Sequence, residues 1–201
     1  VSNMADALPD IVAYNYMKYD AVTAGNHEFD KPVKVLLKQI QEADFPFVIS
    51  NVEMDGKLLG EEYLVKQIDG IKVGLFGLTT SYTANLSVGA KDLVFKNEVE
   101  TARRMVKLLK EKKVDVIIGL VHLGFTETTP DFITSRKLAA QVDGIDILVD
   151  GHSHSYIEEA EKVNNTWIIT ANQSGRYVGE GKLTVKDGKL IGFSWKPVLI
   201  K

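Results

Sequence analysis

Helical periodicity and short β-rich runs alternate along most of the chain, and no other feature of the sequence restricts the fold as much. Apolar residues recur at helical spacing in some segments, and β-branched and aromatic residues gather in short runs between them. A chain that alternates in this way folds into sheets covered by helices, so we predict a layered α/β fold. Helices are expected over 4–17, 30–40, 97–109 and 131–142, and strands over 21–24, 45–49, 63–68, 71–78, 114–121 and 145–149.

Particular residues mark where these helices should begin. Asn3, Asp30 and Asn97 have side chains that accept hydrogen bonds from the first turn of a helix. Pro32 would then lie in the first turn of the helix after Asp30, where proline is tolerated. Glu100, three residues after Asn97, completes a pattern close to the capping box.

Two Asp-Gly pairs predict turns between antiparallel strands. Asp69-Gly70 in the first half of the chain and Asp187-Gly188 in its tail both favour two-residue hairpin turns. We therefore expect antiparallel pairing on either side of each turn, with tail strands over 166–171, 182–186 and 190–195.

Composition limits the domain organisation and the classes of partner. With 201 residues and 45% hydrophobic content the chain fits a single domain over 1–201, and it has no repeat or linker. The net charge of −3 gives no general attraction to nucleic-acid polymers or anionic membranes. No apolar run reaches the roughly 18 residues of a membrane span. The absence of cysteine excludes disulfides and thiolate metal sites. Because the helical pattern starts almost at Val1, we expect a piece of a longer protein.

All four histidines follow the ends of predicted β-runs. His27 comes after 21–24, His122 after 114–121, and His152 and His154 after 145–149. In layered α/β folds the carboxyl ends of neighbouring strands open onto one crevice, where ligands bind. A single histidine is usually an ordinary polar residue near the surface. Four histidines at equivalent positions favour one shared site.

Neutral imidazole is a common ligand of divalent metals such as zinc, manganese and iron. In Gly151-His152-Ser153-His154, the glycine would allow a sharp turn. Two imidazoles on an extended segment would then share a face. Asn26 offers a neutral oxygen ligand, and the adjacent His27 remains free for proton transfer or for stabilising developing negative charge.

Three segments carry a family resemblance. Residues 19–30, which include Gly25-Asn26-His27-Glu28-Phe29-Asp30, resemble the third signature of the calcineurin-like metallophosphoesterases. Val121-His122-Leu123-Gly124 resembles the fourth signature, and residues 151–154 the fifth. Within this family the chain looks most like the 5′-nucleotidases and 2′,3′-cyclic-nucleotide 2′-phosphodiesterases. The family's Asp-x-His and Gly-Asp signatures, which lie upstream of the third, do not occur before residue 19 of the chain.

The resemblance implies a layered α/β/β/α sandwich of mixed sheets flanked by helices, without its first strands. Residues 1–201 would be a catalytic domain that is truncated at its N-terminus and lacks the C-terminal substrate-specificity domain. An extracytoplasmic location is also implied.

The resemblance also implies a role for each site residue. Asn26, His122 and His152 would bind one of two divalent metal ions, and His154 would bind the other. His27 would stabilise the transition state or protonate the leaving oxygen, with Asp30 orienting its imidazole. The second metal position is incomplete in this chain. Asp20 and Asp150 are the nearest carboxylates, but we expect both to be solvated.

The implied function is metal-dependent hydrolysis of nucleotide phosphate esters by a metal-activated water, as in 5′-nucleotidases or 2′,3′-cyclic-nucleotide 2′-phosphodiesterases with 3′-nucleotidase activity. UDP-sugar and thiosulfate-ester hydrolysis stay open as substrate alternatives. A different class of function is a non-catalytic domain that keeps the fold for metal or partner binding. No sequence feature predicts an oligomeric state.

Overall fold

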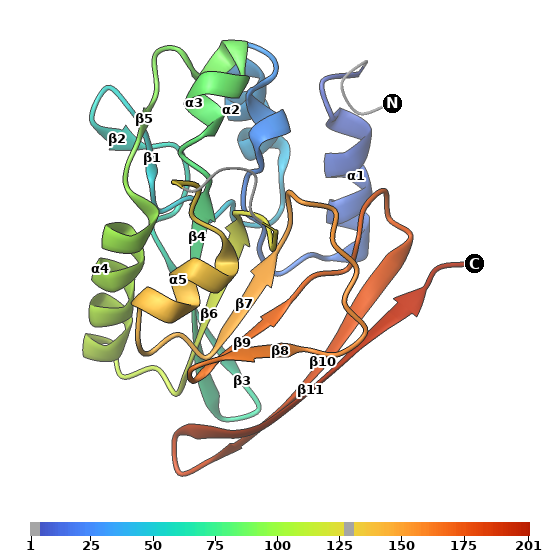
Figure 1. The fold of residues 1–201 in the computed structure, drawn as a ribbon. Coiled ribbons are helices and arrows are strands. Elements are labelled where there is room, and N and C mark those ends of the chain that lie inside the picture. Colours follow the sequence, from blue (N-terminus) through green and yellow to red (C-terminus); the bar gives the residue numbers. More distant parts are fainter. Residues whose placement is uncertain (1–4, 127–130) are drawn as a thin grey trace.

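A six-stranded mixed sheet forms the centre of the computed structural model, which describes residues 5–126 and 131–201 (Figure 1). The strand order is β3-β4-β6-β7-β9-β8. Strands β4, β6, β7 and β9 are parallel, and β3 and β8 pair antiparallel at the two edges. The strands are β3 (Leu64–Ile68), β4 (Ile71–Thr79), β6 (Val116–His122), β7 (Ile147–Asp150), β8 (Glu161–Val163) and β9 (Thr166–Ile169).

The two predicted hairpin turns are confirmed. Asp69 and Gly70 join β3 to β4 with φ values of 48° and 84°. Asp187 and Gly188 join β10 (Tyr177–Lys186) to β11 (Lys189–Leu199) with φ values of 51° and 70°. Two successive residues with positive φ match the twist of the flanking strands, which is why these residue pairs are favoured there.

Helices α4 (Glu98–Glu111) and α5 (Ser135–Gln141) pack against one face of this sheet (Figure 1). Met105 and Leu109 of α4 and Leu138 of α5 are fully buried in this core. The predicted cap of α4 is confirmed, because Asn97 Oδ1 accepts a hydrogen bond from the Glu100 N–H at 3.0 Å. Helix α5 begins later than predicted, because its cap is Thr134, whose hydroxyl accepts from the Lys137 N–H at 3.2 Å.

A second apolar core lies beneath α1 (Leu8–Met17) and α2 (Lys34–Glu42). It contains the 3-10 helix η2 (Asn26–Phe29) and a small sheet in the order β2-β1-β5. The remaining elements are β1 (Val52–Met54), β2 (Lys57–Leu58), β5 (Val94–Phe95), α3 (Thr83–Leu86) and η3 (Val88–Ala90).

Several predicted boundaries around this second core are wrong. The expected strands 21–24 and 45–49 make only isolated bridges, from Val22 to Phe47 and from Val48 to Glu61. Helix α1 begins only at Leu8, because Asp6 and Ala7 both have a positive φ of 54°. Asn3, the expected cap, lies outside the described residues.

Asp30 does not cap α2. That helix begins at Lys34, and the preceding Val33 makes no side-chain capping bond. The carboxylate of Asp30 instead contacts the ring of His27.

The β10–β11 hairpin pairs with no third strand among the described residues. It is attached through side chains instead. Phe193 lies against Trp167 of β9 with ring centroids 5.9 Å apart, and the Trp195 indole N–H donates to the Ile157 carbonyl at 3.2 Å. Both strands are longer than predicted.

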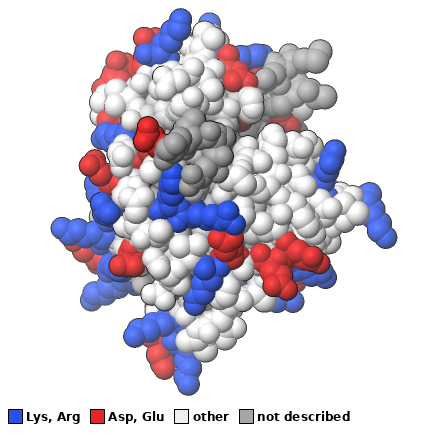
Figure 2. Space-filling view, viewed as in Figure 1, with Lys and Arg blue, Asp and Glu red and all other residues white. Residues whose placement is uncertain are grey.

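The predicted class, a mixed sheet flanked by helices, is confirmed. On the face shown in Figure 2, acidic and basic side chains are interspersed, in agreement with the small net charge. Within the described residues, no helix is both long and apolar enough to cross a bilayer.

Replacing Asn97 with alanine should destabilise the protein by about 1 kcal/mol, because the first turn of α4 loses its side-chain acceptor. Urea unfolding measures the change. Lys107→Ala, at an exposed position of the same helix, is the control and should stay within about 0.5 kcal/mol of wild type. Equal losses in the two variants would contradict the assignment of the cap.

Candidate metal centre

The predicted site residues meet where parallel strands end. Thr79 of β4 is paired with His122 of β6, and Val121 of β6 with Asp150 of β7, so these strand ends lie at one edge of the sheet. The Thr79 hydroxyl donates to the Ala24 carbonyl at 2.8 Å, which holds the start of η2 against this edge. The crevice expected from the histidine positions therefore exists.

Asn26 lies at the centre of this edge and is only 7% exposed. Its Oδ1 is 2.9 Å from His122 Nε2 and 2.9 Å from His152 Nδ1. Two ligand atoms at about 2.1 Å from one octahedral cation, at right angles, lie about 3.0 Å apart. Each of the two oxygen–nitrogen distances therefore suits neighbouring ligands of a single divalent cation.

The ring of His122 fits between two glycines. A Cβ atom on Gly25 would lie 2.8 Å from this ring, and one on Gly151 would lie 3.0 Å from it. Gly151 was expected to allow a sharp turn, but its φ is not in the left-handed region. At both positions glycine is therefore favoured because a larger side chain would collide with the imidazole.

Burial keeps the two central histidines neutral. Burial, the largest effect, and the neighbouring His152, His27 and His154 together lower the pKa of His122 to about 3. Burial also lowers the pKa of His152, with additional effects of His154 and His27. Neutral imidazole is the form that binds metals, so both rings are ready to act as ligands near neutral pH.

The prediction that His152 and His154 share a face of an extended segment is wrong. His152 has a φ of 80° and His154 a φ of 53°, so both lie in the left-handed region. This conformation is costly for residues other than glycine and is concentrated at functional sites.

His154 is exposed, and no hydrogen bond joins it to Asn26, His122 or His152. In the described part of the chain, no three His, Cys, Asp or Glu side chains form a metal-binding group. The three possible metal ligands are Asn26, His122 and His152, and Asn26 contributes an amide oxygen instead of a carboxylate or imidazole.

His27 and Asp30 form a pair, as the sequence predicted. His27 Nδ1 lies 2.8 Å from Asp30 Oδ2, and the side chain of His27 is 69% exposed. A carboxylate at Nδ1 fixes the tautomer and leaves Nε2 free for proton transfer. Ser87, which the sequence did not indicate, supports the pair, because its hydroxyl donates to the Asn26 carbonyl at 3.0 Å and lies 3.4 Å from Asp30 Oδ1.

The two alternative carboxylates differ. Asp20 is exposed and forms an ion pair with Lys66, as expected for a solvated residue. Asp150 is only 8% exposed, so the expectation that it is solvated is wrong. The pKa of Asp150 is raised to about 6, because the effect of burial is larger than the opposite effect of its hydrogen bonds. Those bonds come from the Ser135 hydroxyl and three backbone N–H groups. In the sequence, only its position directly before Gly151 indicated that Asp150 lies near the site.

A groove of about 660 Å³ opens beside the centre, and Gly25 and His122 are among its lining residues. Two more of its lining residues, Asp10 and Thr23, each have a buried side-chain oxygen without a hydrogen-bond partner among the described residues. A buried polar atom without a partner is costly, so these oxygens can form hydrogen bonds with a polar group in the groove.

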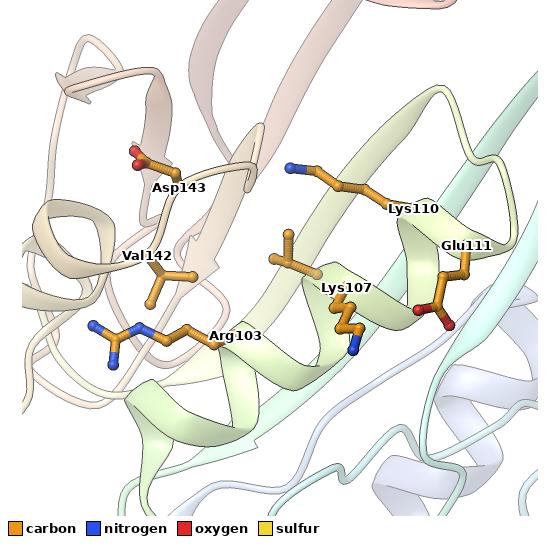
Figure 3. A pocket seen from close by; sticks show the side chains of 7 residues that line it. Arg103, Lys107, Lys110, Glu111, Val142 and Asp143 are labelled. Atoms are coloured by element: carbon orange, nitrogen blue, oxygen red, sulfur yellow. The ribbon is translucent and has the colours of Figure 1, made fainter.

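A second groove, of about 490 Å³, lies along α4 and contains none of the histidines. Arg103, Lys107 and Lys110 line it, and Figure 3 shows these side chains pointing in different directions instead of toward one centre. Their arrangement does not favour binding of a single anion.

Comparison with known proteins identifies the family. The sequence model of the calcineurin-like phosphoesterase family matches residues 2–156, which is most of the chain. The chain belongs to the calcineurin-like phosphoesterases. The family resemblance found in the sequence is thereby confirmed.

Named relatives of this phosphoesterase chain act on nucleotides. The trifunctional nucleotide phosphoesterase protein YfkN of Bacillus subtilis is 33% identical over 87% of the chain, and a 5′-nucleotidase of Vibrio vulnificus is 32% identical over all of it. The crystal structure of a 5′-nucleotidase precursor from Thermus thermophilus superimposes with a TM-score of 0.86 at 28% identity, over 99% of this chain and 42% of that one. The chain spans 14% of the Bacillus protein and 41% of the Vibrio protein.

Gly25→Ala should weaken binding of Mn²⁺ or Zn²⁺ by at least about tenfold, because the added methyl group displaces the ring of His122 from Asn26. Titration calorimetry measures the affinity. Gly192→Ala is the control, since a Cβ there has its nearest neighbour at an ordinary 3.5 Å. Wild-type affinity in the Gly25 variant would show that the position of this ring does not determine binding.

Proposed function

We propose that this chain provides the catalytic centre of a metal-dependent hydrolase of nucleotide phosphate esters. The observation that supports the proposal most directly is the donor triple of Asn26, His122 and His152 close to the His27–Asp30 pair. Membership of the calcineurin-like phosphoesterases supports the reaction class. The names of the relatives, 5′-nucleotidase and nucleotide phosphoesterase, support the substrate class.

The ligands proposed for the first cation are all neutral. Asn26 contributes an amide oxygen, and burial keeps His122 and His152 uncharged. Such ligands leave the full positive charge of a cation available to an anionic ester. When bound, a divalent cation supplies an acidified water and neutralises charge on the phosphoryl oxygens.

His27 is proposed to hold the proton that the leaving oxygen receives. Its Nδ1 is occupied by Asp30 at 2.8 Å, so Nε2 carries the exchangeable proton. Asp30 keeps the imidazole in this tautomer and stabilises its positive charge. The high exposure of His27 leaves it accessible to a substrate.

The second cation position is proposed to include His154, together with ligands from other parts of the protein. A second cation beside the first would be repelled by it, and a carboxylate close to both would offset this repulsion. Within the described residues no carboxylate joins the three donors. The unpartnered oxygens of Asp10 and Thr23 are consistent with a groove that further groups complete.

Residues 1–201 are accordingly proposed to be a metallophosphoesterase catalytic domain. The choice between 5′-nucleotidase and cyclic-nucleotide 2′-phosphodiesterase, and the extracytoplasmic location, stay predictions. The His27–Asp30 pair favours an enzyme over a domain that only binds metal or a partner, because metal binding alone does not require this pair.

His27→Ala should lower kcat for AMP or bis-p-nitrophenyl phosphate by about 10²- to 10⁴-fold in the protein that carries this chain, because the leaving oxygen loses its proton donor. Metal analysis of the same sample should give nearly wild-type content. Asp20→Asn, at an exposed carboxylate, serves as the control and should keep full activity. Loss of metal in the His27 variant would reverse the roles of Asn26 and His27.

The 201-residue chain alone should bind cations at partial occupancy and hydrolyse bis-p-nitrophenyl phosphate only weakly, because its described residues hold one donor triple and no carboxylate that joins it. Turnover by the chain is compared with that of the protein that carries it, at equal Mn²⁺. Robust turnover by the isolated chain would refute this expectation and show that the described donors suffice.

A further inference from the structure

Two loops carry the proposed ligands His122 and His152, and a single carboxylate joins them. Oδ1 of Asp150 accepts three backbone hydrogen bonds, from Leu123 at 3.0 Å, from Gly124 at 3.0 Å and from Gly151 at 2.8 Å. Leu123 directly follows His122, and Gly151 directly precedes His152. One oxygen atom therefore binds the backbone immediately beside each of the two ligands.

A second side chain reinforces this connection. The Ser153 hydroxyl accepts a hydrogen bond from the Phe125 N–H at 2.8 Å and lies 2.8 Å from the Ser155 hydroxyl. The backbone adds one bond, from the Gly151 N–H to the Val121 carbonyl at 3.2 Å. The loop after β6 and the loop after β7 thus form one hydrogen-bonded unit.

The conformation of the second loop needs such support. His152 has a φ of 80°, a region that residues other than glycine occupy only when their surroundings hold them there. Asp150 is only 8% exposed, and Leu123 is fully buried. Without the carboxylate, the Leu123 N–H would lack its acceptor in a buried position, which is costly.

We propose that Asp150 is a positioning residue that sets the spacing between the cation ligands His122 and His152. It acts through the backbone beside them, because its Oδ1 receives three N–H donors from the two loops. The inference rests on the proposed function in one respect, namely that these two histidines bind a cation.

A purely structural role is the competing explanation, and the same strand offers a matched control. Asp146, at the amino end of β7, is also partly buried and accepts a backbone bond from Ile117 at 2.7 Å. It joins β6 and β7 at their amino ends, whereas the histidines lie at their carboxyl ends. Substitutions at Asp146 should disturb folding without moving the ligands.

The experiment compares Asp150→Ala and Asp150→Asn with the same substitutions at Asp146, in the protein that carries this chain. Affinity for Co²⁺ is measured by calorimetry, its coordination by visible absorption, and stability by thermal unfolding. Asp150→Ala should weaken Co²⁺ binding at least about tenfold and alter the absorption spectrum. Asp150→Asn, which keeps an oxygen acceptor, should recover affinity to within about threefold of wild type. Both Asp146 variants should bind as wild type does.

Amide hydrogen exchange without metal tests the same idea independently of cation binding. In Asp150→Ala, exchange should accelerate at least about tenfold at Leu123, Gly124 and Gly151, and the nuclear Overhauser contact between the His122 and His152 rings should weaken. If the wild type binds no Co²⁺, the proposed function fails, and these two measurements still decide the role of Asp150.

Three results would overturn the proposal. One is wild-type affinity and an unchanged ring contact in Asp150→Ala. Another is a loss of affinity in the Asp146 variants as large as that at Asp150. If Asp150→Ala does not fold, Asp150→Ser, whose shorter side chain withdraws the acceptor, replaces it, and unchanged exchange at Leu123 and Gly124 with wild-type affinity would also overturn the proposal.

Discussion

The parallel pairing of β4, β6 and β7 is the constraint on which the rest of the site depends. Because Thr79 is paired with His122 and Val121 with Asp150, three strands end at one edge. Apolar packing of α4 and α5 against the sheet holds these strands in register. A shift of one strand by a single residue would turn His122 to the opposite face of the sheet. The geometry of the donors is thus a property of the central sheet as much as of the loops.

The side chains that complete the site come from a different part of the chain. Asn26, His27 and Asp30 belong to η2 or directly follow it, and η2 lies in the second core. The contact between the Thr79 hydroxyl and the Ala24 carbonyl joins this segment to the sheet. The proposed chemistry therefore requires the two cores to be assembled together, with His122 and His152 from one and Asn26 and the proton carrier His27 from the other.

Local signals in the sequence predicted a large part of this structure. The Asp-Gly turns and the Asn97 cap depend on residues within a few positions of one another, and both were confirmed. The positions of the histidines after β-runs identified the correct edge of the sheet, because strand ends follow from local patterns. The donor triple of Asn26, His122 and His152 also followed from the sequence and the resemblance that it carries.

Most errors concern features that depend on distant contacts. Asp30 is an exception, because two local roles were expected of it; the contact with His27 is present, whereas α2 begins only at Lys34. His152 and His154 adopt positive φ in a loop that Asp150 and Ser153 tie to the loop after β6. Asp150 and Ser87 act on residues that lie between 26 and 61 positions away in the sequence, and no local pattern reveals such partners.

The packing of His122 between Gly25 and Gly151 has a thermodynamic consequence. The imidazole lies so close to both glycines that an added Cβ at either would come within 3.0 Å of it, and this close packing restricts the ring. The conformational entropy of this side chain is therefore lost when the protein folds, before any ligand arrives. A ligand that binds to His122 Nε2 has no such ordering to oppose it, and its affinity gains from a donor that is already in place.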